Sequence, residues 1–110
     1  MKKAGIIRCQ LTEDKCPGTN DFRVAANGLK AFETVGNCEV IGFISCGGCP
    51  GTKVGHRVQL LEAKGAEVIA ISSCISKGSP FKKVCQNWDK MQEEIENHIN
   101  EKTILLNYTH

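Results

Sequence analysis

Residues 40–51 read VIGFISCGGCPG and contain the change of pattern from which the fold can be predicted. The run that ends at Ser45 is continuous and mostly apolar, which is typical of a strand buried on both faces of a parallel sheet. Glycines and a proline then predict a loop over residues 46–51, and apolar side chains at helical spacing predict a helix that Gly65 ends. A strand, a loop and a helix in this order form one unit of an α/β fold.

The same alternation continues toward both ends of the chain. Short apolar runs predict further strands, and helical spacing predicts further helices, one of them with Asn87 as its N-cap. The predicted elements are strand 4–8, loop 10–19, helix 20–36, strand 40–44, loop 46–51, helix 54–65, strand 67–72, loop 75–86, helix 88–99 and strand 103–106. This order predicts one α/β domain, residues 1–110, with a three-layer, doubly wound, parallel four-stranded sheet. Right-handed crossovers make the flavodoxin-like strand order 2-1-3-4 the simplest solution.

The composition is that of an ordinary folded domain. Of the 110 residues, 41% are hydrophobic and fall in periodic segments, so we expect a sufficient core without metal or disulfides. The formal net charge of +2 and the scattered lysines give little support for a nucleic-acid partner. The apolar run at residues 4–7 is too short for a secretory signal or a membrane span, which predicts a cytoplasmic protein with no membrane partner. The pattern makes no prediction of oligomeric state.

Three cysteines follow the ends of predicted strands. The chain has seven cysteines, and in a reducing compartment their spacing indicates metal or thiol chemistry rather than structural disulfides. Cys9, Cys46 and Cys74 come at or just after the first, second and third strands. The carboxyl ends of parallel strands meet at the edge of the sheet where α/β folds bind ligands. Because neighbouring strands lie about 4.8 Å apart, these thiols can share one ion or cluster.

Three further candidates belong to the same edge. Cys16 and Cys85 lie in the loops that leave the first and third strands, and His110 follows the last strand. Cys38 precedes the second strand and therefore belongs to the opposite end, where we expect it to be a small, semi-buried apolar residue. For His56, on the second helix, we favour an exposed position.

Cys46 and Cys49 form a CxxC pair, whose spacing allows two thiolates to bind one ion. The two glycines between them allow a tight turn, and the N-terminus of the following helix would stabilise thiolate charge. A strand, a CxxC pair and a helix in that order is also the local layout of thioredoxin-like dithiols. The pair by itself therefore leaves metal binding and thiol chemistry open.

Taken together, these motifs resemble the CGGC-domain family, bacterial and archaeal proteins described as candidate metal-binding domains. The resemblance rests on residues 5–9 (GIIRC), 16–19 (CPGT), 42–51 (GFISCGGCPG), 73–75 (SCI) and 108–110 (YTH), and so extends along the whole chain. It implies a metal-binding role and carries over the following functional candidates: Cys9, Cys16, Cys46, Cys49, Cys74, Cys85 and His110. It says nothing for Cys38, and it supplies neither a reaction nor a catalytic residue.

Our first hypothesis is therefore a metal-binding α/β domain. Its primary ligands are Cys9, Cys46, Cys49 and Cys74, and its second tier is Cys16, Cys85 and His110. Zinc is the default metal, whereas the surplus of thiols favours an iron–sulphur cluster or a site that also does thiol chemistry. The alternative is a thiol–disulfide redox or sulphur-transfer enzyme that uses the Cys46/Cys49 pair with a small-molecule or protein redox partner. A binding module whose thiols merely line a pocket is a third possibility.

Overall fold

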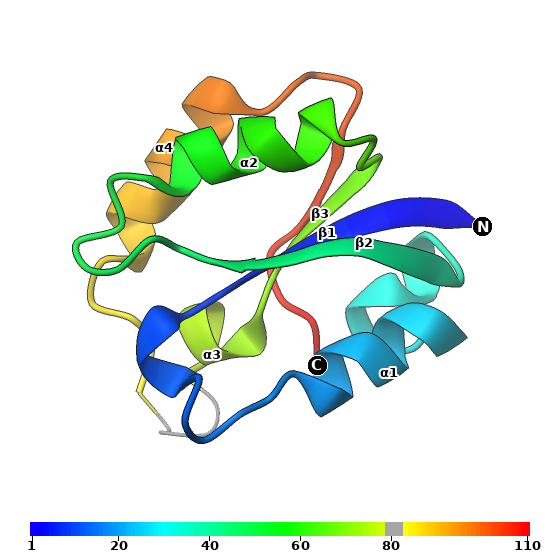
Figure 1. Cartoon of the computed structure of the whole chain (residues 1–110), viewed down its shortest axis with the longest axis horizontal. Coiled ribbons are helices and arrows are strands. Elements are labelled where there is room, and N and C mark those ends of the chain that lie inside the picture. The colour runs from blue at the N-terminus through cyan, green and yellow to red at the C-terminus, as the bar shows by residue number, and fades with distance from the viewer. Residues whose placement is uncertain (79–82) are drawn as a thin grey trace.

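Four strands and four α-helices make up the fold in the computed structural model, which describes residues 1–78 and 83–110 (Figure 1). The strands are β1 (Lys2–Arg8), β2 (Cys38–Ser45), β3 (Val68–Ile71) and β4 (Ile104–Leu106). The α-helices are α1 (Thr19–Asn27), α2 (Val54–Ala63), α3 (Ser73–Ser76) and α4 (Trp88–His98). Two 3-10 turns are η1 (Gln10–Thr12) and η2 (Lys30–Thr34). The predicted loop 75–86 lies partly outside the described residues, at 79–82.

The sheet confirms the predicted class and strand order. Its strands run β2-β1-β3-β4, and every pairing is parallel. The register places Ile7 of β1 opposite both Ile44 of β2 and Ile71 of β3. The carboxyl ends of these three strands therefore lie at one edge, as ligand sites of open α/β sheets require.

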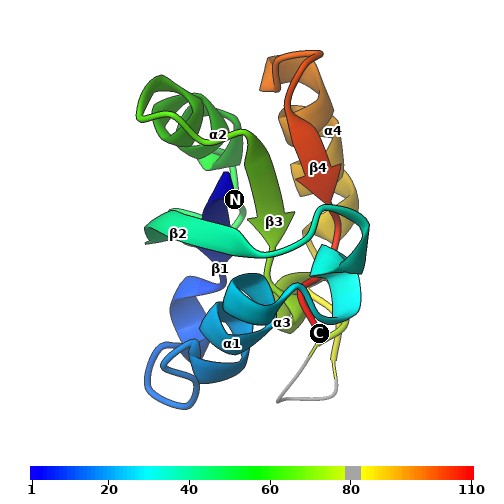
Figure 2. The ribbon, with the colours of Figure 1, turned by 90° about the vertical axis from the view of Figure 1, so that its right-hand side faces the viewer.

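Helices cover both faces of the sheet and enclose two apolar clusters. α2 and α4 lie on one face, and α1 with η2 lies on the other (Figures 1 and 2). Buried side chains such as Ile69 and Ile95 form the first cluster, whereas Val24 and Phe32 belong to the second. α2 approaches closely where the sheet has glycine, because a Cβ added to Gly42 would lie 2.5 Å from Cδ2 of Leu61.

Two local predictions were wrong. The predicted helix 20–36 ends at Asn27, since Gly28 adopts a left-handed conformation with φ of 64° and donates its N–H to the carbonyl of Val24. The apolar spacing beyond it belongs to η2, which still buries Phe32. The short helix α3 was not predicted, because four residues are too few for a helical period to be recognised in the sequence.

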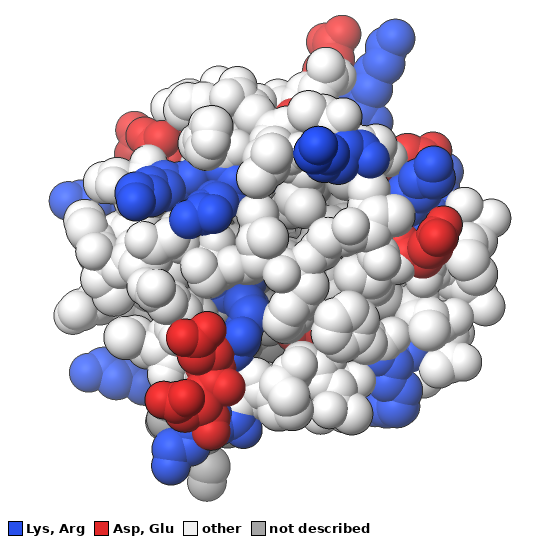
Figure 3. Space-filling view, in the orientation of Figure 1, with Lys and Arg blue, Asp and Glu red and all other residues white. Residues whose placement is uncertain are grey.

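The surface in Figure 3 shows Lys and Arg side chains interspersed with acidic and neutral residues rather than joined in one basic patch. Among the described residues, no helix has both the length and the apolar character needed to cross a membrane.

Candidate functional site

The predicted strand-end cysteines meet because backbone pairing continues past the strands. The N–H of Cys46 donates to the carbonyl of Arg8 at 2.8 Å, and the N–H of Ser72 donates to Ile7 at 2.9 Å. Cys9 follows β1 directly, and Cys74 lies in the first turn of α3. The N–H of Cys9 donates to the Sγ atom of Cys74 at 3.3 Å, which joins the ends of β1 and β3 at a sulphur atom.

Cys85, which lies between α3 and α4 in the chain, belongs to the same group. Its N–H donates to the carbonyl of Ile75 at 3.0 Å, which fixes it beside α3. Burial raises the pKa of both the Cys9 and the Cys85 thiol above the ordinary value of 9.0, and the nearby charges of Cys46 and Cys74 raise both further. Cys9 and Cys85 also pack against the apolar cluster that contains Cys46 and Cys74, so the four residues are gathered in one part of the fold. We name Cys9, Cys46, Cys74 and Cys85 the thiol cluster.

Cys49 differs from its CxxC partner in exposure. Cys46 is buried, whereas Cys49 is exposed and adds to the charges that raise the pKa of Cys85. Gly47 and Gly48 both have positive φ, 88° and 91°, so the chain turns sharply between the two cysteines. Cys49 thus lies at the rim of the thiol cluster.

Backbone N–H groups favour thiolate charge at two of the thiols. The N–H groups of Leu11 and Asn87 lower the pKa of Cys9 and Cys85, against the larger effect of burial. α2 begins at Val54, as predicted, after Lys53 as its N-cap residue. Asn87 is the N-cap residue of α4, as predicted, although its side chain makes no capping hydrogen bond.

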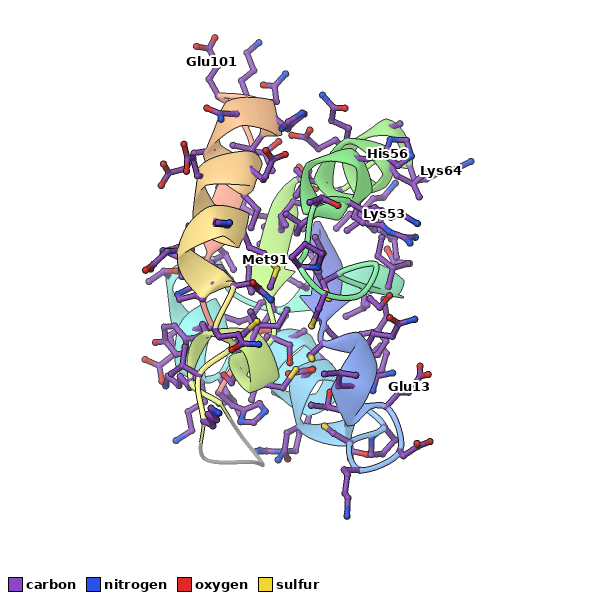
Figure 4. The ribbon with its side chains drawn as sticks, turned by 90° about the vertical axis from the view of Figure 1, so that its left-hand side faces the viewer. Glu13, Lys53, His56, Lys64, Met91 and Glu101 are labelled. Carbon is purple, nitrogen blue, oxygen red and sulfur yellow. The ribbon has the colours of Figure 1, made fainter. Side chains whose placement is uncertain are left out.

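A cleft of about 280 Å³ gives access to the thiols. Cys9, Cys49, Cys74 and Cys85 line it together with Leu11 and Val84, whose side chains are 69% and 46% exposed. Figure 4 shows sulphur atoms gathered below Met91 and around the end of β1, whereas Lys53, just before α2, and His56, on α2, lie away from them. The cleft is therefore a largely apolar opening lined by four cysteines, with Lys83 also in its lining.

Cys16 and His110 line a second cavity, of about 260 Å³. Cys74 lines it as well, so the two cavities meet at this residue. The carbonyl of Cys16 accepts a hydrogen bond from Arg8 at 2.9 Å, and Nε2 of His110 lies 3.6 Å from Oδ1 of Asp21. These two second-tier candidates therefore lie beside Cys74, and Cys85 lies within the thiol cluster.

A buried polar network beneath Cys74 was missed by the sequence reasoning. Asp21 is 1% exposed and accepts hydrogen bonds from the hydroxyls of Ser72 and Thr109. Ser73 bonds to the backbone of Thr109 and His110. Near the start of a predicted helix, Asp21 resembles an ordinary N-terminal acidic residue, so no pattern marked it as buried.

Cys38 lies apart from the thiol cluster and from the network around Asp21. It begins β2 opposite Lys2, at the other end of the sheet, and is buried in the second apolar cluster. Burial raises its pKa above 9.0, with no contribution from another cysteine. All seven cysteines fall in the described ranges, and each is a free thiol.

The thiol cluster fits a soft metal in the kind and the number of its donors, since zinc and iron–sulphur sites take up to four cysteine sulphurs. In residues 1–78 and 83–110, however, no three His, Cys, Asp or Glu side chains stand at the separations that one bound ion requires.

Comparison with known proteins shows the family. The CGGC domain matches residues 3–110, and the chain belongs to this family. It is 36% identical over 102 residues to "Uncharacterized protein MJ0582" of Methanocaldococcus jannaschii, covering 86% of this chain and 80% of that protein. It is 43% identical over 54 residues to "Uncharacterized protein MJ0766" of the same organism, covering 48% of this chain and 77% of that one. No solved structure gives a significant match.

Proposed function

We propose that this CGGC-domain protein binds a metal centre through its thiol cluster, Cys9, Cys46, Cys74 and Cys85, with Cys49 at the rim. The observation that carries this proposal is geometric: four thiols, from three strand ends and one loop, lie within or against one buried cluster, and the Cys9 N–H donates to the Sγ atom of Cys74. The proposed ligand set differs from the one predicted from sequence. It includes Cys85 as a ligand and has Cys49 at the rim.

A bound cation would remove the main electrostatic cost of this arrangement. Burial and the neighbouring cysteines oppose ionisation of Cys9 and Cys85. A divalent ion stabilises thiolates directly and displaces their protons.

Zinc is the first candidate, because four thiolates complete its tetrahedral shell. An iron–sulphur cluster also takes four cysteine ligands, and the N–H groups of Leu11 and Asn87 near Cys9 and Cys85 would suit its negative charge. Either centre would persist best in a reducing, cytoplasmic compartment, the location that we propose.

Purification without oxygen, followed by metal and acid-labile sulphide analysis and a visible spectrum, tests this function. Colourless protein with one zinc per chain supports zinc, and brown protein with iron and sulphide supports a cluster. Protein that remains free of metal after reconstitution with zinc, and separately with iron and sulphide, would contradict the proposal.

The exposure of Cys49 beside buried Cys46 favours one second candidate, thiol–disulfide exchange. The Cys49 thiolate would attack a disulfide of a small-molecule or protein partner and form a mixed disulfide, releasing one partner thiol. Cys46 would then displace the second partner thiol, leaving a Cys46–Cys49 disulfide and a reduced partner. Mass-spectrometric mapping of metal-free protein after reaction with glutathione disulfide tests it. A Cys46–Cys49 link is expected if it holds, and Cys49 that stays reduced argues against it.

A further inference from the structure

The turn that carries Cys74 rests on a buried carboxylate. Asp21, in the first turn of α1, is 1% exposed. Its Oδ2 accepts a hydrogen bond from the Ser72 hydroxyl at 2.9 Å, and its Oδ1 accepts one from Thr109 and lies 3.6 Å from Nε2 of His110. Buried carboxyl oxygens are stable only when donors replace their lost hydration, so the hydrogen bonds to Asp21 hold the Ser72 and Thr109 hydroxyls in place.

The next residue of the turn is bonded to the same C-terminal segment. The N–H of Ser73 donates to the Thr109 hydroxyl at 3.1 Å. The Ser73 hydroxyl in turn accepts the N–H groups of Thr109 and His110 at 3.1 and 2.9 Å. Figures 1 and 2 both show the C-terminus beside α1 and α3. Both residues that precede Cys74 are therefore anchored from outside their own helix.

External anchoring matters here because α3 is only four residues long. A helix of this length has too few internal hydrogen bonds to fix its own orientation. Cys74 must nevertheless point its sulphur at the N–H of Cys9, 3.3 Å away, to belong to the thiol cluster.

We infer that Asp21 and Thr109 are positioning residues for Cys74: through Ser72 and Ser73 they hold its thiol in the metal site. This inference rests on the proposed function, in which Cys74 is a ligand. It also gives His110 a role other than that of a metal ligand, because its ring faces Asp21 and its N–H completes the bonding of Ser73.

The chain offers a matched control at the opposite end of the sheet. There the Thr103 hydroxyl donates to Oε2 of Glu62, again a threonine bonded to a carboxylate. Thr103→Val therefore removes the same kind of hydrogen bond far from the thiol cluster. Thr109→Val and Asp21→Asn disrupt the network, and Thr109→Ser retains its hydroxyl.

Alkylation of metal-free, reduced protein with iodoacetamide, followed residue by residue with mass spectrometry, tests the positioning without any metal. Cys74 and Cys38 are 7% and 2% exposed, so Cys38 reports global unfolding in the same molecule. We expect the ratio of Cys74 to Cys38 alkylation rates to rise roughly tenfold in Thr109→Val and Asp21→Asn. The ratio should stay at the wild-type value in Thr109→Ser and Thr103→Val. An unchanged ratio in both network variants would overturn the inference.

Zinc competition titrations then connect the positioning to the site. Thr109→Val should lower zinc affinity about 10- to 100-fold, the usual effect of losing a group that orients a ligand. In a Cys74→Ser background it should cause no further loss, because the residue being positioned is gone. Equal losses in both backgrounds would contradict the inference. Wild-type protein that takes up no metal would contradict the proposed function instead, while the alkylation ratio would still decide the positioning.

Discussion

The two ends of β2 each bury a cysteine, but the surroundings of the two thiols differ. Cys38, at the amino end, is 2% exposed and packs among apolar side chains such as Ile6 and Val68. Cys46, at the carboxyl end, is 3% exposed and belongs to the apolar cluster against which Cys9 and Cys85 pack. Burial is thus the same at both ends. The two ends differ because only at the carboxyl ends of the strands do the loops bring together thiols that are distant in sequence.

The largest expected effect of this difference is on metal affinity. Cys46→Ser removes a proposed ligand and should lower zinc affinity by more than about 100-fold, beyond the usual effect of altering a group that only orients a ligand. Cys38→Ser should leave zinc affinity and stoichiometry unchanged. Competition against a chromophoric chelator measures both.

A loss of affinity in Cys38→Ser as large as that in Cys46→Ser would remove the distinction between the two ends. In that case metal binding would depend on the stability of the whole fold rather than on the thiol cluster.

The second expected effect is on the pH dependence of binding. The pKa values of Cys9 and Cys85 are raised above 9.0, chiefly by burial, so both thiols are protonated near neutral pH before metal binds. Each thiol that releases its proton on binding adds a factor of about ten per pH unit to the rise of zinc affinity below its pKa. Cys85→Ser should therefore lower the slope by about tenfold per unit, and Cys38→Ser should not change it. Equal slopes in all three proteins would argue against both thiols as ligands.

The same pKa shifts predict that the free energy of unfolding of the metal-free protein falls as the pH rises. A thiol whose pKa is raised in the folded state retains its proton when the unfolded chain has already lost it. The stability associated with Cys9, Cys38 and Cys85 is therefore complete below pH 9.0 and falls as the pH rises above it. Urea denaturation of metal-free, reduced protein between pH 8 and pH 10 should show this decline.

Metal removal has a smaller expected effect, because the core is complete without the site. The two apolar clusters pack on opposite faces of the sheet: the first holds Cys46 and Cys74 among many aliphatic side chains, and the second contains no member of the thiol cluster. Chelation should leave the far-ultraviolet circular dichroism spectrum largely intact. Free zinc at 100 times its dissociation constant should add about 2.7 kcal/mol to the free energy of unfolding. A cooperative loss of helix and strand on chelation would show instead that the metal is structural.

Much of this arrangement could be predicted because it follows from chain order. The alternation of strands and helices fixes the parallel sheet, and the sheet fixes which end receives Cys9, Cys46 and Cys38. Cys85 could be predicted only as a second-tier candidate, since its place beside α3 depends on a hydrogen bond to Ile75 that no periodicity reports. Asp21 was missed for a similar reason, because its donors Ser72 and Thr109 are far from it in sequence. Contacts made by loops and termini leave no repeating pattern in the chain.

The smallest expected effect is on the free energy of unfolding of the metal-free protein when a cysteine near either end of β2 is replaced. Cys38→Ala removes a sulphur atom from the second apolar cluster and should lower the free energy of unfolding by about 1 kcal/mol. Cys49→Ala, at the exposed rim of the cleft, should change it by no more than about 0.5 kcal/mol. Urea denaturation of both variants with chelator and reductant present measures the difference. A larger loss for Cys49→Ala would mean that the CxxC loop contributes to packing. The contrast between Cys38, which packs in the core, and the cysteines of the CxxC loop would then be contradicted.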